Sequence, residues 1–265
     1  MEGTPDERRH LAATFDTVPD GYHRARPAYP SSLFDRLLVV TGLTPSARVL
    51  EIGCATGTAT RPMAERGFAV TCIERGPALA AAARRSLADL DVDVRVGEFE
   101  EFSGDAPYDL VFAATAWHWI DPAVRYGKAA ELLRAGGHLA FWSATHVFPP
   151  GGDDFFYELQ PVYDAIGQGV PGGASYPAPG ELPDERVQIE ASGRFDVVDV
   201  SHFDWETTYD ADGYIDLLNT FSGHIAMAKW QRQRLYDEIR ARLSARSGAS
   251  LRRHWGAVLH VARRQ

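Results

Sequence analysis

The fold is decided by the stretch Val49-Leu50-Glu51-Ile52-Gly53-Cys54-Ala55-Thr56-Gly57-Thr58. A short, mostly apolar strand over 48–52 leads into a glycine-rich turn, and a helix is predicted to follow to about residue 66, where Gly67 ends it. Glycine is needed where a backbone takes a positive φ or approaches a ligand closely. This stretch therefore predicts a strand, a tight turn and a helix that together can hold a ligand.

The same alternation continues along the chain. Further strands are predicted over 68–73, 92–96, 108–115 and 138–142, and helices over 77–90 and 121–134. Strands that alternate with helices at this spacing are parallel and joined by crossovers. We expect an α/β fold with a Rossmann-like, doubly wound, mostly parallel seven-stranded sheet whose last strand is antiparallel. A helical N-terminal arm and a helical cap insertion are expected to flank it.

The flanking segments are less regular than the core. A helix over 32–41 is predicted to start at a capping box formed by Ser32 and Asp35 and to end at Gly42. The remaining elements are predicted as helices over 153–166, 214–221 and 229–246, a loop over 167–183, and strands over 195–206 and 255–262.

The composition narrows the classes of partner. The chain has 265 residues, with 27 Lys and Arg against 36 Asp and Glu and a formal net charge of −9. Such an acidic chain is poorly suited to bind nucleic acid or an anionic membrane surface. No apolar run is long enough to span a bilayer, and residues 1–10 show no secretory signal. Two cysteines, Cys54 and Cys72, exclude a disulfide framework and a cysteine-built zinc site. A reducing, cytoplasmic location without a bound metal is expected.

The glycine register argues against a dinucleotide. A dinucleotide site requires G-x-G-x-x-G, but this turn reads Gly53-x-Ala55-x-Gly57, with Thr58 at the third glycine. Glu51 at the strand end would repel a pyrophosphate and suits a ligand that carries a cation, such as an ammonium.

Residues 49–58 resemble motif I of the class I S-adenosylmethionine-dependent methyltransferases, (D/E)-x-G-x-G-x-G, with Ala55 at the middle glycine. Residues 108–115 and 133–139 are similar to later segments of that family. Outside this core, residues 22–30, 116–121 and 217–222 resemble the small-molecule methyltransferases of the methyltransferase-11/25 kind, a group that includes trans-aconitate methyltransferase.

This resemblance implies S-adenosylmethionine as cofactor and S-adenosylhomocysteine as product. It places Glu74 at the ribose, residues 97–100 at the adenine, Arg26 at the methionine carboxylate, and Tyr22 or Tyr29 in the site wall. The full set of candidate cofactor-binding residues is Tyr22, Arg26, Glu51, Gly53, Cys54, Ala55, Gly57, Glu74, Arg75, Glu98, Phe99 and Thr115. His118 is a candidate general base, or a histidine that orients its loop by hydrogen bonding.

The resemblance also implies one methyltransferase domain over 1–265. Its parts are an arm and helix (1–44), a cofactor-binding core (45–143), cap or substrate insertions (144–194 and 207–250) and the last strands (195–206 and 251–265). The expected reaction is in-line methyl transfer to a small-molecule acceptor, preferably at a carboxylate or hydroxyl oxygen. A non-catalytic cofactor-binding module and an NAD-dependent oxidoreductase are the alternatives.

The segment after the fifth strand is expected to form the acceptor pocket, because ligands in open α/β sheets bind beyond the carboxyl ends of the strands. Its aromatic residues suggest an apolar or aromatic acceptor; they are Phe155, Phe156, Tyr157, Tyr163 and Tyr176. A nucleic-acid amino-methyltransferase would show (N/D)-P-P-(Y/F) after the fourth strand, where this chain has Thr115-Ala116-Trp117-His118. The sequence leaves the oligomeric state open.

Overall fold

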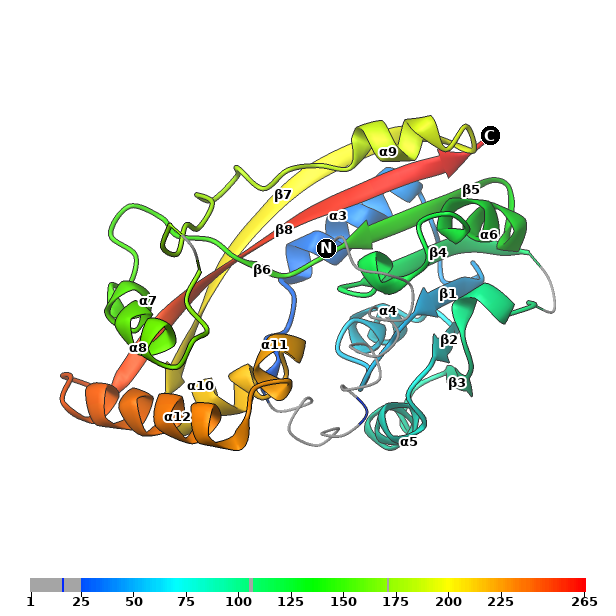
Figure 1. Cartoon of the computed structure of the whole chain (residues 1–265). Coiled ribbons are helices and arrows are strands. Elements are labelled where there is room, and N and C mark those ends of the chain that lie inside the picture. The colour runs from blue at the N-terminus through cyan, green and yellow to red at the C-terminus, as the bar shows by residue number, and fades with distance from the viewer. Residues whose placement is uncertain (1–15, 17–24, 105–106, 171) are drawn as a thin grey trace.

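The computed structural model describes residue 16 and residues 25–104, 107–170 and 172–265. Five parallel strands form its core (Figure 1): β1 (Val49–Ile52), β2 (Val70–Glu74), β3 (Val92–Val96), β4 (Tyr108–Ala114) and β5 (Leu133–Trp142). The sheet order is β3-β2-β1-β4-β5-β8-β6, with β7 paired to β8. The order reverses between β1 and β4, which is where open α/β sheets bind ligands.

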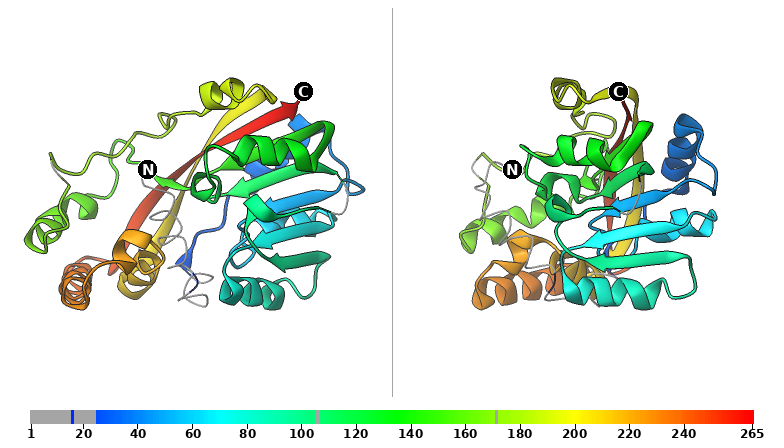
Figure 2. Two further views of the ribbon diagram at one scale, coloured as in Figure 1. Left: turned by 45° about the vertical axis from the view of Figure 1, so that its right-hand side comes forward. Right: turned by 90° about the vertical axis from the view of Figure 1, so that its right-hand side faces the viewer.

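Helices cover both faces of this sheet (Figure 2), because side chains alternate along each strand. Val49 and Leu110 face a cluster that includes side chains of α3 (Ser31–Thr41), α4 (Thr60–Glu65) and α5 (Pro77–Ser86). Leu50 and Val111 face the opposite cluster, which includes side chains of α6 (Arg125–Leu132) and α9 (Arg186–Ala191). The predicted doubly wound, Rossmann-like fold is confirmed.

A long antiparallel ribbon leaves the core sheet (Figure 1). It consists of β7 (Phe195–Asp210) and β8 (Ser250–Arg264), which pair from Phe195 with Arg264 to Asp210 with Ser250. The other edge of β8 pairs with β5 over 138–141 and with β6 (Thr145–His146). β6 is the eighth strand, where the sequence predicted seven.

Five helices pack around the far end of this ribbon: α7 (Phe155–Glu158), α8 (Gln160–Ala165), α10 (Ala211–Leu218), α11 (Ser222–Ile225) and α12 (Lys229–Ser244). We call these helices and the ribbon end they cover the cap. The cap has its own apolar cluster, which includes Phe155, Leu217 and Trp255. It therefore packs around side chains largely separate from those of the two core clusters.

Several predicted boundaries were wrong for local reasons. The helix predicted over 153–166 is two helices, α7 and α8, and Pro161, which lacks an amide hydrogen, lies in the first turn of the second. The capping box is absent: α3 begins at Ser31 after Pro30, and Ser31 bonds the Asp35 carboxylate instead of a backbone amide.

Other elements changed in length. α5 ends at Ser86, four residues early, and α6 begins at Arg125, because 121–124 form a turn. Both ribbon strands are longer than predicted. In β7 most alternate residues face solvent, which obscures the apolar pattern, and β8 extends its buried run, 255–262, with more polar residues at both ends. The helices α9 and α11 were not predicted.

Gly57 offers a test of the turn after β1. Its φ is +93°, and a Cβ there would lie 2.7 Å from Leu87 Cδ1. Gly42 also has positive φ, +65°, but open space around it. We expect Gly57→Ala to lower the free energy of unfolding by about 2–4 kcal/mol, from backbone strain plus overpacking. Gly42→Ala should cost only about 1–2 kcal/mol.

Urea unfolding of both variants checks this difference. Leu87 is itself a core residue, so Leu87→Ala alone should also lower stability. The double variant should lose less than the sum of the two single losses, because it lacks the side chain that the new Cβ meets. Equal losses for the two glycine variants would contradict the packing explanation.

Candidate functional site

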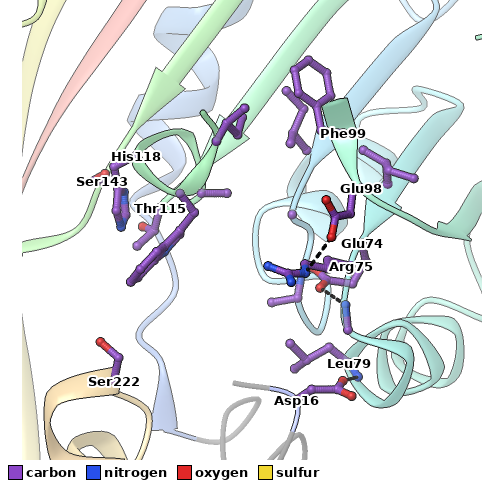
Figure 3. Close-up of a pocket in the computed structure, with 18 of the residues that line it drawn as sticks. Asp16, Glu74, Arg75, Leu79, Glu98, Phe99, Thr115, His118, Ser143 and Ser222 are labelled. Atoms are coloured by element: carbon purple, nitrogen blue, oxygen red, sulfur yellow. Dashed lines mark hydrogen bonds and ion pairs between the residues drawn. The ribbon is translucent and has the colours of Figure 1, made fainter. Parts of the chain in front are cut away.

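A cavity of about 620 Å³ lies at the carboxyl ends of the core strands (Figure 3). Its wall comes from the segments that follow each of the five parallel strands, from Asp16 and Arg26 of the arm, and from Phe221 and Ser222 of the cap. This is a usual size for a small-molecule site. The core, arm and cap thus all contribute to one cavity.

The turn after β1 forms part of the cavity wall. Gly53 has φ +67°, and a Cβ there would lie 2.7 Å from Cβ of Ala116, so glycine is required by conformation and by space. Ala55 adopts φ +49° although it carries a side chain. A non-glycine residue in this region stores roughly 1–2 kcal/mol of strain, and such strain gathers at functional sites.

Glu74, at the end of β2, holds this turn in place. Its carboxylate is buried and accepts two backbone hydrogen bonds, from the amide of Ala55 at 2.8 Å and from the amide of Gly76 at 2.8 Å. Burial raises the pKa of Glu74, while the two amides act in the opposite direction. Glu74 therefore joins the glycine turn to the start of α5.

The part of the cavity wall around Glu74 contains both charged and apolar side chains (Figure 3). Arg75 and Glu98 form an ion pair of 3.3 Å at the cavity wall. Phe99 is buried, and Phe99 and Leu79 both line the cavity. Asp16 of the arm accepts the amides of Ala78 and Leu79, at 2.8 and 2.9 Å, in the first turn of α5. This end of the cavity combines an apolar wall with carboxylates.

Glu51 lies beneath the other end. It is 1% exposed, and its carboxylate accepts a hydrogen bond from the Thr60 hydroxyl at 2.6 Å. Burial raises the pKa of Glu51 to about 8. A small pocket of about 30 Å³ touches Glu51 and shares Arg26, Gly53 and Thr115 with the large cavity. Glu51 is thus a buried carboxyl next to the cavity floor.

The arm is fastened across this end. The Tyr29 hydroxyl bonds the Thr115 hydroxyl at 2.7 Å, and Thr115 itself has φ +57°. Arg26 donates to the carbonyl of Thr220 in the cap at 2.9 Å and lies over the Phe221 ring, 4.6 Å from its centre. Arg26 therefore links the arm to the cap at the cavity wall.

His118 follows β4 in a short 3-10 turn, Trp117–Trp119, and lines the cavity with Trp119 and Ser143. Burial lowers the pKa of His118 to about 4. Its imidazole is therefore neutral at pH 7 and weakly basic. Trp119, the next residue, also belongs to the cavity wall.

Most predicted cofactor residues meet in one place. Those that line the large cavity are Arg26, Gly53, Ala55, Glu74, Arg75, Glu98, Phe99 and Thr115, together with His118. Glu51 and Cys54 adjoin it through the small pocket, and Gly57 lines neither. Tyr22 lies outside the described residues.

The sequence missed lining residues from the arm, the end of β5 and the cap, of which Asp16, Ser143, Phe221 and Ser222 are examples. The 217–222 segment was a signal for the last two, but nothing in the sequence indicated that Asp16 reaches α5.

The described residues can also be searched for a reactive thiol, a metal site and a membrane-spanning helix. The thiols of Cys54 and Cys72 are buried, and the hydrogen bond that the Cys54 thiol donates to Cys72, followed by burial, raises the pKa of Cys54, so this thiol stays protonated. Across residues 25–104, 107–170 and 172–265 there is no group of three metal-binding side chains, and none of the helices there is long and apolar enough to cross a membrane.

Sequence comparison agrees with this geometry. Residues 49–137 match the sequence model of a family described as "Methyltransferase domain". An uncharacterized methyltransferase of Mycobacterium tuberculosis is 35% identical over 133 residues, which are 50% of this chain and 52% of that protein. A ubiquinone biosynthesis O-methyltransferase of Xanthomonas campestris is 37% identical over 100 residues, covering 36% and 42% of the two chains. The chain spans about half the length of the curated relatives it matches most strongly.

Structure comparison extends the likeness in fold to most of the chain. A candidate type II methyltransferase from Anaeromyxobacter dehalogenans aligns with a TM-score of 0.57 at 23% identity and covers 90% of this chain and 97% of its own. A candidate methyltransferase from Bacillus halodurans aligns at 0.53 and 16%, covering 88% and 99%. Residues 49–137 are therefore similar to methyltransferase domains in sequence, and the Rossmann-like fold of the chain is similar to that of these two structures.

Proposed function

We propose that this chain transfers the methyl group of S-adenosylmethionine to an oxygen of a small-molecule acceptor. The observation that carries the proposal is Glu74, whose buried carboxylate is fixed by two backbone amides at the rim of the 620 Å³ cavity. Each carboxylate oxygen keeps a free lone pair, so the pair can accept the two ribose hydroxyls, as acidic residues do in dinucleotide folds.

The rest of the cavity matches the other parts of that cofactor. Phe99, Leu79 and Ile73 offer an apolar wall for an adenine. Arg26 supplies a cation for the amino-acid carboxylate, and Glu51 lies beneath the same end for the ammonium. S-adenosylmethionine, when bound, supplies a methyl group already activated on a sulfonium, so the protein contributes alignment and exclusion of water.

The acceptor side favours a carboxylate oxygen over a hydroxyl. A general base works best with a pKa near the working pH, but His118, the histidine at this wall, has a pKa of about 4. A carboxylate is already ionised and needs no base. His118 then contacts the acceptor as a neutral imidazole that holds its oxygen by a hydrogen bond.

Cofactor binding tests the proposal directly. S-adenosylhomocysteine should bind the wild-type protein in calorimetry, and Glu74→Ala should weaken it about tenfold to a hundredfold, the cost of losing hydrogen bonds to a charged group. Glu131→Ala is the matched control, because Glu131 is 73% exposed on α6 and far from the lining. Folded wild-type protein that binds no S-adenosylhomocysteine would refute the function.

Glu51 gives a pH-dependent test. Its pKa is about 8 in the fold against 4.5 in the unfolded chain, so the folded state retains a proton that the unfolded state releases between these values. Wild-type stability should therefore fall as pH rises from about 4.5 to 8. Glu51→Gln should remove that decline. At pH 8 its free energy of unfolding should therefore exceed that of the wild type by a few kcal/mol.

Urea unfolding at pH 5 and pH 8, with Glu131→Gln as control, checks the stability of Glu51→Gln. The same variant should bind S-adenosylhomocysteine more weakly, because it cannot ionise to pair with an ammonium. A variant that is both less stable at pH 8 and unchanged in affinity would contradict this role.

His118 separates the two kinds of acceptor oxygen. We expect His118→Gln to lower kcat less than about tenfold and to leave the pH–rate profile between pH 6 and 8 unchanged, because an ionised acceptor needs no base. A loss of about 10²–10⁴-fold, the usual contribution of a general base, would instead identify a protonated acceptor. Methyl transfer from labelled S-adenosylmethionine to small carboxylic acids and phenols is the assay.

A further inference from the structure

Arg253, on β8 inside the cap, is a buried cation. The residue is 8% exposed, and no ion pair involves it anywhere in the part of the chain that the structure describes. Its neighbour Arg246, by contrast, pairs with Asp153 at 2.8 Å. A buried charge without a partner of opposite sign is costly, so its presence calls for an explanation.

Aromatic rings surround the Arg253 guanidinium. Its central carbon lies 4.4 Å from the centre of the Trp255 ring, 5.6 Å from that of Phe221 and 5.7 Å from that of Phe156. Burial lowers the pKa of Arg253, and four tyrosines act in the opposite direction; they are Tyr163, Tyr176, Tyr209 and Tyr214. Rings and neutral phenols compensate a cation only in part, so the site retains net positive character.

Among the described residues, several buried polar atoms around Arg253 lack a hydrogen-bond partner; they are Nε of Arg253, Nε2 of His146, Nε1 of Trp255 and the Tyr209 hydroxyl. The His146 ring meets the Phe156 ring edge-on and the Tyr176 ring at a tilt, with both ring centres 4.3 Å away. Burial, and then the charge of Arg253, lower the pKa of His146 to about 2. Buried polar atoms are nearly always satisfied, and a group of exceptions points to a missing ligand or water. Here a donor that is always charged lies near a neutral imidazole.

This place adjoins the cofactor cavity. The Phe221 ring, which lines the cavity, contacts two guanidiniums, with Arg26 at 4.6 Å and Arg253 at 5.6 Å from its centre. Thr145, which precedes His146, also lines the cavity. Arg253 and His146 therefore each adjoin a residue of the cavity wall.

We propose that Arg253 binds an anionic group of the acceptor, so that the acceptor carries a carboxylate in addition to the oxygen that is methylated. The aromatic rings around Arg253 contact the apolar part of that acceptor, and His146 offers its second polar contact. A guanidinium binds a carboxylate through two parallel hydrogen bonds, which fixes orientation as well as position. This inference rests on the proposed function, since it concerns the second substrate of the same cavity.

The test compares two probes that differ in charge and not in shape, benzoate and benzamide, on protein loaded with S-adenosylhomocysteine. Benzoate should raise the melting temperature of the wild type by a few degrees at saturating concentration, and benzamide should not. Arg253→Met should lose the benzoate response. Arg252→Met is the matched control, because Arg252 is the next residue of β8 with a side chain 49% exposed, and it should respond as the wild type does.

A second readout does not depend on any ligand. Arg253→Met removes an uncompensated buried charge and keeps an apolar side chain of similar length, so its melting temperature should equal or exceed that of the wild type. A lower melting temperature, or no benzoate response in the wild type, would overturn the assignment of Arg253.

The experiments can refute the proposed function and the assignment of Arg253 independently of each other. If S-adenosylhomocysteine does not bind, the proposed function itself is wrong. If it binds with the same affinity to the wild type and to Arg253→Met, while benzoate protects both proteins or neither, only the assignment of Arg253 is wrong.

Discussion

The site depends on one carboxylate that is held by the backbone around it. Glu74 ends β2, and its two oxygens accept the amides of Ala55 and Gly76. Those bonds fix the turn after β1 against the start of α5, which compensates for the strained φ of Ala55. They also cost the carboxylate much of its hydration. The geometry of the cavity rim is therefore set by backbone donors, which side-chain substitutions elsewhere leave in place.

The core was predictable because its signals are local and repeated. The apolar strand 49–52, the glycine turn and the regular alternation up to residue 142 predicted parallel strands and both helical layers, and the structure confirms them. The cap was predicted less well. Its strand β7 exposes nearly every second residue, the helix predicted over 153–166 is split near Pro161, and its short helices carry little periodicity. Tertiary packing determines these elements.

The site residues also fall into a group that the sequence predicted and a group that it did not. Glu74, Glu98 and Thr115 follow core strands, so the strand pattern alone placed them at one edge of the sheet. Asp16 and Phe221 reach the cavity from segments far away in sequence, and a single chain holds no signal for such contacts. Arg253 could not be singled out, because an arginine in an arginine-rich segment resembles a solvated one until burial is known.

The ribbon has a consequence for how the protein is made. β8 is the last strand in the sequence. It pairs with β7 along one edge and with β5 and β6 along the other. Until it is synthesised, β5 and β7 present unpaired edges, which are templates for aggregation. The nascent chain must therefore pass through a stage in which its half-built sheet is open. Shielding by a chaperone would matter most at that stage.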